Sequence, residues 1–310
     1  MEESVVKIEH LSHKYSVQWA IRNINFEIKE KGILGLLGSN GAGKSTTMNI
    51  ICGVLNQTEG EVYLNGINLR ENPVEAKKHI GFLPQKPPLY PDLTVDEYLT
   101  LCAHLHLVNK SDIKKAVDTA KEKCNITHFS KRLIRNLSGG YQQRVGIAQA
   151  IVHNPKFVVL DEPTNGLDPN QIVEIRNLIK EIATDRTVML STHILSEVQA
   201  TCDNIKMIEQ GQVVFSGSMD EFDNYIEPTT FLVTLDNPPA IEELEAIEGI
   251  RQVESLENST YRIQFNALKT ITEKMVEKSI SNGWELREIH LERESLDDIF
   301  AQLSGKRTHK

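Results

Sequence analysis

The sequence predicts an α/β protein with a largely parallel sheet, a helical insert and a small second α/β domain. Apolar runs alternate with helical patterns up to about Gly217, strand signals are missing between residues 87 and 155, and the pattern changes after Ile226. Strands that alternate with helices are typical of parallel sheets covered by helices. A chain of 310 residues suffices for two domains, which we expect at 1–226 and 227–310.

The first domain contains eight apolar segments bounded by polar or glycine-containing stretches. Several are apolar throughout, as expected for central strands that are buried on both faces. The predicted strands are 5–11, 21–28, 32–38, 61–66, 79–85, 156–161, 187–192 and 204–217.

A helical subdomain is predicted at about residues 87–155. Its three segments with helical periodicity are 95–107, 112–124 and 141–153. Because strands precede and follow this stretch, we expect it to be an insert in the α/β core.

The second domain has the element order β-α-β-β-α-β, which is typical of a ferredoxin-like, split βαβ fold. We expect a further helix at 295–305 to close it. The predicted elements are the strand 231–235, the helix 240–247, the strands 250–257 and 260–265, the helix 267–281 and the strand 284–292.

Composition excludes several classes of protein. A net charge of −9 without clustered Lys and Arg argues against nucleic acid as a partner. The sequence shows no leader pattern and no run of about 18 apolar residues, so we expect a cytoplasmic protein that reaches a membrane only through a partner. The cysteines are too scattered for a zinc or redox motif and are expected to be reduced and buried; they are Cys52, Cys102, Cys124 and Cys202.

A glycine-rich stretch, GSNGAGKST, follows the apolar strand 32–38 and precedes a helical pattern. This context fits the phosphate-binding motif G-x-x-x-x-G-K-[ST] better than a chance glycine-rich turn. Lys44 is expected to reach the β- and γ-phosphates, and the Ser45 hydroxyl is expected to ligate Mg²⁺. The predicted nucleotide-binding residues of this loop are Gly38, Ser39, Asn40, Gly41, Ala42, Gly43, Lys44, Ser45 and Thr46.

Two consecutive carboxylates end the apolar strand in KFVVLDEPT. Neighbours on a strand point to opposite faces, so Asp161 and Glu162 are expected to do different jobs. We assign Asp161 to the Mg²⁺ shell and Glu162 to the general base or water-orienting group. A solvated acidic pair is the alternative, and the phosphate loop disfavours it.

Two further polar residues stand at the carboxyl ends of predicted strands, where open α/β sheets bind ligands. His193 follows the strand 187–192, and Gln85 ends the strand 79–85. Gln85 is a candidate to contact Mg²⁺ or the attacking water. Taken alone, each residue has an ordinary structural explanation, so both assignments depend on the neighbouring motifs.

Together with LSGGYQQR at 137–144, these elements resemble the ATP-binding subunit of ABC transporters. In that family two nucleotide-binding domains meet head to tail, and the Ser-Gly-Gly turn of one faces the γ-phosphate held by the other. A helix N-terminus suits this task. The motifs that carry the resemblance, from about residue 5 to 225, are Tyr15, the loop 38–46, Gln85, LSGGYQQR, VVLDEP, NGLD ending at Asp168, and His193.

The resemblance implies roles for residues that spacing alone does not assign. Tyr15 stacks on adenine, and Asp168 supports communication across the dimer. The turn Ser138, Gly139 and Gly140 contacts the opposite γ-phosphate, which His193 senses. Tyr141 and the NGLD sequence depart from the commoner Gln and SALD, and Trp19 near Tyr15 leaves open that Tyr15 is a core aromatic.

The ending ESLDDIFAQLSG resembles the C-terminal extension of bacterial export ATPases of the drug-resistance, sodium-export and gliding-motility-associated kinds. This implies a homodimeric ATPase, with ATP and Mg²⁺, that drives export through a separate membrane permease at the inner face of the cell membrane. An ABC-type ATPase acting on ribosomes or DNA is the alternative. A nucleotide-binding regulator without turnover is disfavoured by Glu162 and His193.

Overall fold

The computed structural model describes residues 4–29, 31–225, 229–266 and 271–292, with Ile299, Leu303 and Gly305. It divides into two compact units, Met1–Met219 and Asp220–Lys310. The predicted change of pattern after Ile226 and most of the predicted helix 295–305 lie outside the described residues.

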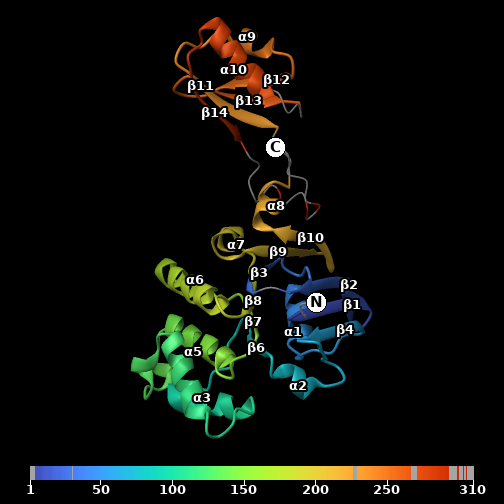
Figure 1. Cartoon of the computed structure of the whole chain (residues 1–310), viewed down its shortest axis with the longest axis vertical. Helices are drawn as coiled ribbons and strands as arrows, with labels where there is room; N and C mark the ends of the chain where they lie inside the picture. The colour runs from blue at the N-terminus through green and yellow to red at the C-terminus, as the bar shows by residue number, and fades with distance from the viewer. Residues whose placement is uncertain are drawn as a thin grey trace. The chain divides into compact units, whose positions relative to one another are not determined.

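A six-stranded sheet forms the centre of the first unit (Figure 1). Five strands are parallel and the edge strand β10 is antiparallel, so the predicted largely parallel sheet is confirmed. The strands β7 and β8 are buried along their whole length, which explains their continuous apolar sequences. The spatial order is β10 (Gln212–Ser218), β9 (Asn204–Glu209), β3 (Gly32–Leu37), β8 (Thr187–Ser191), β7 (Phe157–Asp161) and β6 (Ile80–Leu83).

Three strands predicted for this core belong instead to a separate antiparallel sheet. Its order is β2 (Gln18–Ile28), β1 (Val6–Tyr15), β4 (Glu59–Leu64) and β5 (Ile67–Asn68). Only two residues connect β1 to β2, and a connection that short permits an antiparallel pair but no parallel crossover. The two sheets share one apolar core with the helix α1 (Lys44–Ile51), which contributes Met48 and Ile50.

The predicted strand residues 204–217 form a hairpin of β9 and β10. Gln210 and Gly211 connect the strands with φ angles of 49° and 77°. Two successive positive φ angles are typical of the tight turn that best matches the twist of a two-stranded ribbon.

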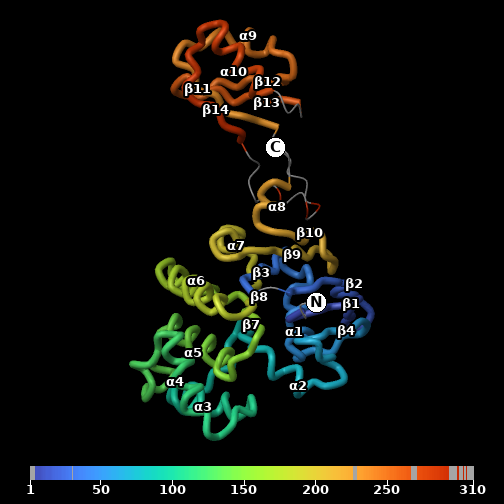
Figure 2. Tube along the Cα trace, in the orientation of Figure 1, coloured from blue at the N-terminus to red at the C-terminus, as the bar shows by residue number. Residues whose placement is uncertain are grey.

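The helical insert is present as predicted, and Figure 2 shows its helices gathered on one side of the first unit. Thr94 and Glu97 form a reciprocal capping box that fixes the start of α3. The insert consists of α3 (Val95–Leu105), α4 (Ile113–Lys123), the short 3₁₀ turns Thr127–Phe129 and Ile134–Asn136, and α5 (Gly139–Ile151). The other helices of the first unit are α2 (Pro73–Lys77), α6 (Pro169–Ala183) and α7 (Leu195–Thr201), and α8 (Met219–Asp223) begins at its last residue. Within the described ranges, no helix is both long and apolar enough to span a membrane.

The second unit has the predicted split βαβ topology. Burial alternates along β11, which places one face of its sheet on the apolar core around Phe231 and Trp284. The sheet order is β12 (Ile250–Ser255), β13 (Thr260–Phe265), β11 (Thr230–Leu235) and β14 (Leu286–Glu292), with the helices α9 (Ile241–Glu245) and α10 (Ile271–Asn282) in the connections.

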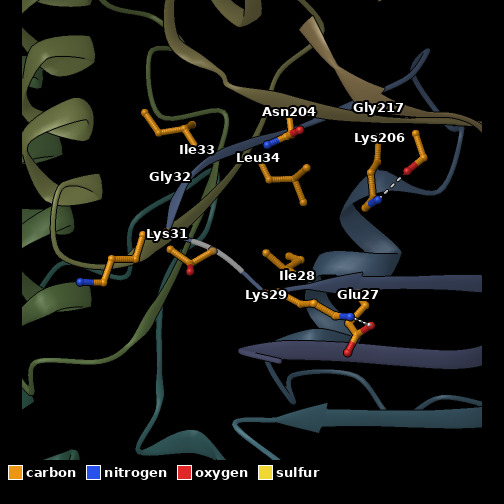
Figure 3. A pocket seen from close by; sticks show the side chains of 12 residues that line it. Glu27, Ile28, Lys29, Lys31, Gly32, Ile33, Leu34, Asn204, Lys206 and Gly217 are labelled. Atoms are coloured by element: carbon orange, nitrogen blue, oxygen red, sulfur yellow. Dashed lines mark hydrogen bonds and ion pairs between the residues drawn. The ribbon is translucent and has the colours of Figure 1, made fainter. Parts of the chain in front are cut away.

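A pocket of about 250 Å³ lies where β3 begins (Figure 3). Lys29 pairs with Glu27 at 3.2 Å, and Lys206 donates to the Ser216 hydroxyl at 2.6 Å. The residues lining this pocket include none of those predicted to bind nucleotide, which lie near the opposite ends of the strands.

Candidate active site

The predicted phosphate loop connects β3 to α1, and neighbouring parts of the chain leave no room for side chains at two of its glycines. At Gly38 (φ 152°) a Cβ would lie 2.1 Å from the Ile208 carbonyl oxygen. At Gly43 (φ 111°) it would lie 2.5 Å from Ile21. No side chain caps the start of α1, and a helix start of this kind is suited to bind an anion.

Lys44 is the cation of this loop. Its side chain is 7% exposed, and its Nζ donates to the carbonyl oxygens of Gly38 at 2.7 Å and Ser39 at 3.1 Å. Burial lowers the pKa of Lys44, and nearby carboxylates, Glu162 foremost, oppose that shift. The backbone of the loop therefore already holds the positively charged end of Lys44 in place.

Asp161 is the last residue of β7 and is 8% exposed. Its carboxylate accepts a hydrogen bond from the Ser191 hydroxyl. Burial raises the pKa of Asp161, while hydrogen bonds from Ser191 and Ser45 oppose the rise. In the part of the chain that the structure describes, no group of three His, Cys, Asp or Glu side chains could hold a metal. A magnesium ion here would depend on hydroxyl and single carboxylate oxygens, which Mg²⁺ accepts.

The backbone turns sharply between the two carboxylates. Glu162 has a φ of 48°, and its N–H donates to the carbonyl oxygen of Ser191 at 3.1 Å and to its hydroxyl at 3.2 Å. Asp161 ends the strand while Glu162 leaves it, so the two side chains have different partners. The side chains therefore differ because the strand ends between them, and not because they alternate along it as the sequence argument assumed; the different jobs assigned to them stay a prediction.

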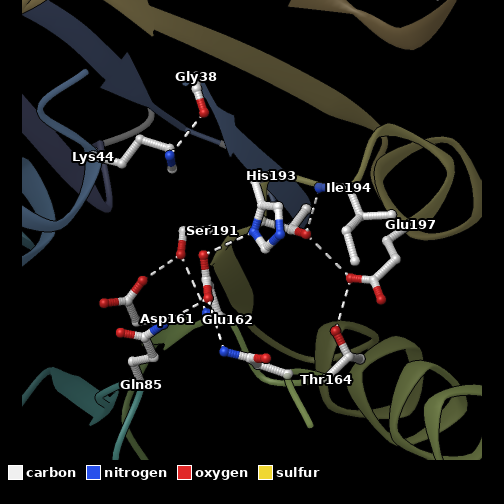
Figure 4. A network of polar contacts seen from close by, with 12 residues as sticks. Gly38, Lys44, Gln85, Asp161, Glu162, Thr164, Ser191, His193, Ile194 and Glu197 are labelled. Atoms are coloured by element: carbon white, nitrogen blue, oxygen red, sulfur yellow. Dashed lines mark hydrogen bonds and ion pairs between the residues drawn. The ribbon is translucent and has the colours of Figure 1, made fainter. Parts of the chain in front are cut away.

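Three donors from three segments meet at the Glu162 carboxylate (Figure 4). Gln85 Nε2 donates to Oε2 at 2.7 Å, and Asn165 Nδ2 reaches the same oxygen at 3.2 Å. His193 Nδ1 lies 3.0 Å from Oε1. The structure thus brings Gln85, Glu162 and His193 together at the ends of β6, β7 and β8. Such an arrangement can orient a carboxylate toward a bound water.

A second polar network anchors the segments that carry Glu162 and His193. Glu197 is buried at the start of α7 and accepts hydrogen bonds from Thr164 Oγ1 at 2.7 Å and from Thr192 Oγ1 at 3.2 Å. The Thr192 hydroxyl also accepts from the N–H of Ile194 at 3.0 Å. These bonds tie the segment after β7 to the segment after β8.

The Ser-Gly-Gly turn begins α5, on the helical insert. Ser138 is the N-cap, but its side chain makes no cap hydrogen bond. A Cβ at Gly139 would have nothing within 4 Å, whereas one at Gly140 would meet the side chain of Gln171 at 2.8 Å. Its first glycine therefore faces open space.

Tyr15 and Asp168 lie on other elements. Tyr15 ends β1 with 53% of its surface exposed and meets His13 edge-on at 4.7 Å, so it is not a core aromatic. Asp168 is the N-cap of α6, where its side chain accepts from the N–H of Gln171 at 3.0 Å. Within one chain, Asp168 thus has a capping role in its own helix.

Sequence reasoning missed three residues of this region. Asn165 lies beside the acidic motif, three residues after Glu162, and this short spacing could have identified it as a partner of the carboxylate. Ser191 ends the strand next to β7 and bonds to the Asp161 carboxylate and to the backbone N–H of Glu162. Glu209 binds Ser39 from 170 positions away, and the sequence contains no pattern that links the two.

A family model described as ABC transporter matches residues 21–165. The bacitracin transport ATP-binding protein BcrA of Bacillus licheniformis is 31% identical over 304 residues, which cover 97% of this chain and 98% of the relative. The lantibiotic transport ATP-binding protein SrtF of Streptococcus pyogenes is 34% identical and covers 72% of this chain and 95% of the relative.

Solved structures match the fold of most of the chain. The cbiO1 protein from Clostridium perfringens, part of the ABC transporter complex cbiONQ, aligns with a TM-score of 0.66 and 28% identity over 80% of this chain and 96% of its own. A dimeric ATP-binding cassette in a post-hydrolysis state, bound to ADP and Pi, aligns with a TM-score of 0.62 and 29% identity over 69% of this chain and 98% of its own.

Proposed function

Because this chain belongs to the ABC transporter family of ATP-binding proteins, we propose that the polar cluster at the ends of β6, β7 and β8 catalyses ATP hydrolysis that drives a separate membrane permease. The chain is an ATPase that uses ATP with Mg²⁺. The observation that carries the site assignment is the Glu162 carboxylate, which three donors orient close to the phosphate loop.

Glu162 is the general base or water-orienting group. Catalysis of phosphoryl transfer depends mainly on positioning of the reactants and on stabilisation of charge. Gln85 and His193 hold the carboxylate at 2.7 and 3.0 Å, and these bonds fix the orientation in which it would accept a proton from a bound water. Lys44 supplies positive charge to the β- and γ-phosphates.

The loop 38–46 holds the phosphates through its backbone N–H groups and the start of α1. Ser45, Gln85 and Asp161 would hold Mg²⁺, which would offset negative charge on the phosphates. Tyr15 offers its exposed ring to adenine.

A head-to-tail homodimer completes each site. Ser138, Gly139 and Gly140 of one chain face the γ-phosphate held by the other, and Asp168 lies at the shared boundary. Two features support this: the uncapped start of α5 with open space at Gly139, and the dimeric state of a similar cassette bound to ADP and Pi. Each dimer then has two active sites.

Two substitutions test the assignment of the base. Glu162→Gln keeps the shape and removes the basic oxygen, so turnover should fall at least 100-fold while ATP binding persists and the dimer stays closed. Lys44→Ala should instead weaken nucleotide binding directly. ATPase rate, equilibrium binding of ATP and size-exclusion chromatography with ATP measure these effects, and multiple turnovers by the Glu162→Gln protein would contradict the assignment.

The names of the relatives support a direction of transport and a kind of partner. Two of them are named for transport of bacitracin and of a lantibiotic, which supports export through a permease at the inner face of the cell membrane. An affinity pull-down of Glu162→Gln from detergent-solubilised cells, with and without ATP, tests this. Recovery of a polytopic membrane protein supports export, whereas ribosomes or nucleic acid without one would favour the alternative.

The second unit is a separate domain that regulates or stabilises the dimer. It follows a complete ATPase core and has its own apolar core. Truncation after Ile226 should change the ATPase rate, dimerisation or assembly with the permease. If all three stay at wild-type values, the second unit has another purpose.

A further inference from the structure

One carboxylate binds the phosphate loop itself. The Oε2 atom of Glu209 accepts the backbone N–H of Ser39 at 3.2 Å, and Oε1 accepts the Ser39 hydroxyl at 2.5 Å. Glu209 is 9% exposed and ends β9, so its side chain is held by the sheet. Both donors of the second loop residue are therefore directed to Glu209.

The turn next to Glu209 supports the other end of the loop. The N–H of Gly211 donates to the carbonyl oxygen of Ala42 at 2.9 Å, and the Gly211 carbonyl accepts from the N–H of Arg22 at 2.8 Å. The carbonyl of Ile208 lies so close to Gly38 that no Cβ fits between them. The hairpin of β9 and β10 thus contacts the loop at its beginning, at Ser39 and at Ala42.

A carboxylate at this place opposes the binding of phosphate, because like charges repel more strongly where water is excluded. Its two hydrogen bonds provide a physical reason for its presence. They fix the orientation of Ser39 before nucleotide arrives, and a loop that is already ordered loses less entropy on binding. Glu209 also adds to the negative charge around Lys44.

We propose that Glu209 is a positioning residue for nucleotide binding, which holds the phosphate loop in its binding conformation through Ser39. The proposal rests on the function proposed above, because it requires the loop to bind ATP. It concerns the ground-state affinity for nucleotide and not the chemical step, so it predicts a change in Kd and KM with a smaller change in kcat.

Two substitutions of Glu209 separate its hydrogen bonds from its charge. Glu209→Gln keeps both bonds, since its amide oxygen accepts from the Ser39 N–H and its NH₂ group donates to the Ser39 hydroxyl. Glu209→Ala removes both. We expect the Ala variant to bind mant-ATP about tenfold more weakly, the size of one or two lost hydrogen bonds, and the Gln variant to stay within about threefold of wild type.

Controls keep the test independent of folding. Gln212→Ala changes an exposed residue of the same hairpin and should leave mant-ATP binding unchanged. Ser39→Ala removes one of the two bonds without touching the sheet, and adding Glu209→Ala to it should cost less than the two single effects combined. Thermal unfolding of every variant establishes that it folds.

The outcomes are distinct. Wild-type affinity in Glu209→Ala would overturn the proposal, and so would equal losses in Glu209→Gln and Glu209→Ala, because the hydrogen bonds that Gln keeps would then not account for the loss. If the wild-type chain itself does not bind mant-ATP, the proposed function fails instead.

Discussion

The phosphate loop and the Ser-Gly-Gly turn are both glycine-containing turns that open a helix, yet their surroundings differ. Added Cβ atoms at Gly38 and Gly43 would lie 2.1 and 2.5 Å from other parts of the chain. At Gly139 an added Cβ would meet nothing within 4 Å, and the Ser138 side chain makes no cap hydrogen bond. The loop is enclosed by its own chain at Gly38 and Gly43, though not at Gly41, whereas the turn is open at Gly139 and closed by Gln171 at Gly140.

This difference indicates how the two turns share one task. Glycine loses more conformational entropy on folding than any other residue, so its presence in a turn needs a reason. At Gly38 and Gly43 of the loop the reason is visible within one chain, because the Ile208 carbonyl and the Ile21 side chain pack against them. In the turn the same chain gives no such reason at Gly139, and a nucleotide held by a second chain would supply one. Predictions about glycines and about mixed dimers can test this.

The largest effect is expected at the enclosed loop. Gly38→Ala places a methyl group against the Ile208 carbonyl and forces a positive φ on a residue with a side chain. Strain of this kind costs about 2–4 kcal/mol of stability, and a displaced loop should lose at least 100-fold in ATP affinity. Thermal unfolding and mant-ATP titration measure both. A normal affinity would show that the loop is less constrained than its contacts indicate.

Mixing two inactive variants should restore activity if the turn serves a partner chain. Lys44→Ala impairs the loop and Ser138→Ala impairs the turn, so each homodimer has two defective sites. In a heterodimer, the intact loop of the Ser138→Ala chain meets the intact turn of the Lys44→Ala chain. An equimolar mixture that forms dimers at random should recover roughly a quarter of wild-type ATPase activity, provided that each site works independently.

Activity of the mixture that only averages the two separate variants would contradict the head-to-tail arrangement. A mixture of Lys44→Ala with Glu162→Gln is the matched control, since both defects fall in the same half of the site. No heterodimer of that pair contains an intact site.

The sequence predicted which segments form strands and helices better than it predicted which strands pair and which side chains meet. Continuous apolar runs such as 156–161 identified buried parallel strands. A strand buried on both faces has apolar residues at successive positions, and this pattern is visible in the local sequence. The separate antiparallel sheet was not predicted, since the pairing of β1 with β4 depends on residues some 50 positions apart. Gln85, Glu162 and His193 were predicted because each lies at or just after the carboxyl end of a predicted strand. Glu209 was not, because its bond to Ser39 depends on how β9 lies beside β3.

A smaller effect is expected at Asp161, beside the enclosed loop. Burial raises the pKa of this carboxyl above its unfolded value, so its ionised form disfavours folding. That penalty is absent below the unfolded pKa and fully present above the folded one. Asp161→Asn should therefore raise the unfolding temperature of the nucleotide-free protein at neutral pH by roughly 2 °C while ATPase activity with Mg²⁺ is lost. The gain in unfolding temperature should vanish near pH 3, and a lower unfolding temperature at neutral pH would contradict the sign.

The smallest effect on stability is expected at the open turn. Gly139→Ala adds a methyl group where nothing lies within 4 Å, at the first residue of a helix, where Ala is at least as favourable as Gly. Its unfolding temperature should stay within about 1 °C of wild type. ATPase activity should nevertheless fall about tenfold, because the methyl group would stand between the turn and the partner's nucleotide. A fall in stability comparable to that of Gly38→Ala would mean that Gly139 serves its own fold, and the contrast between the two turns would be lost.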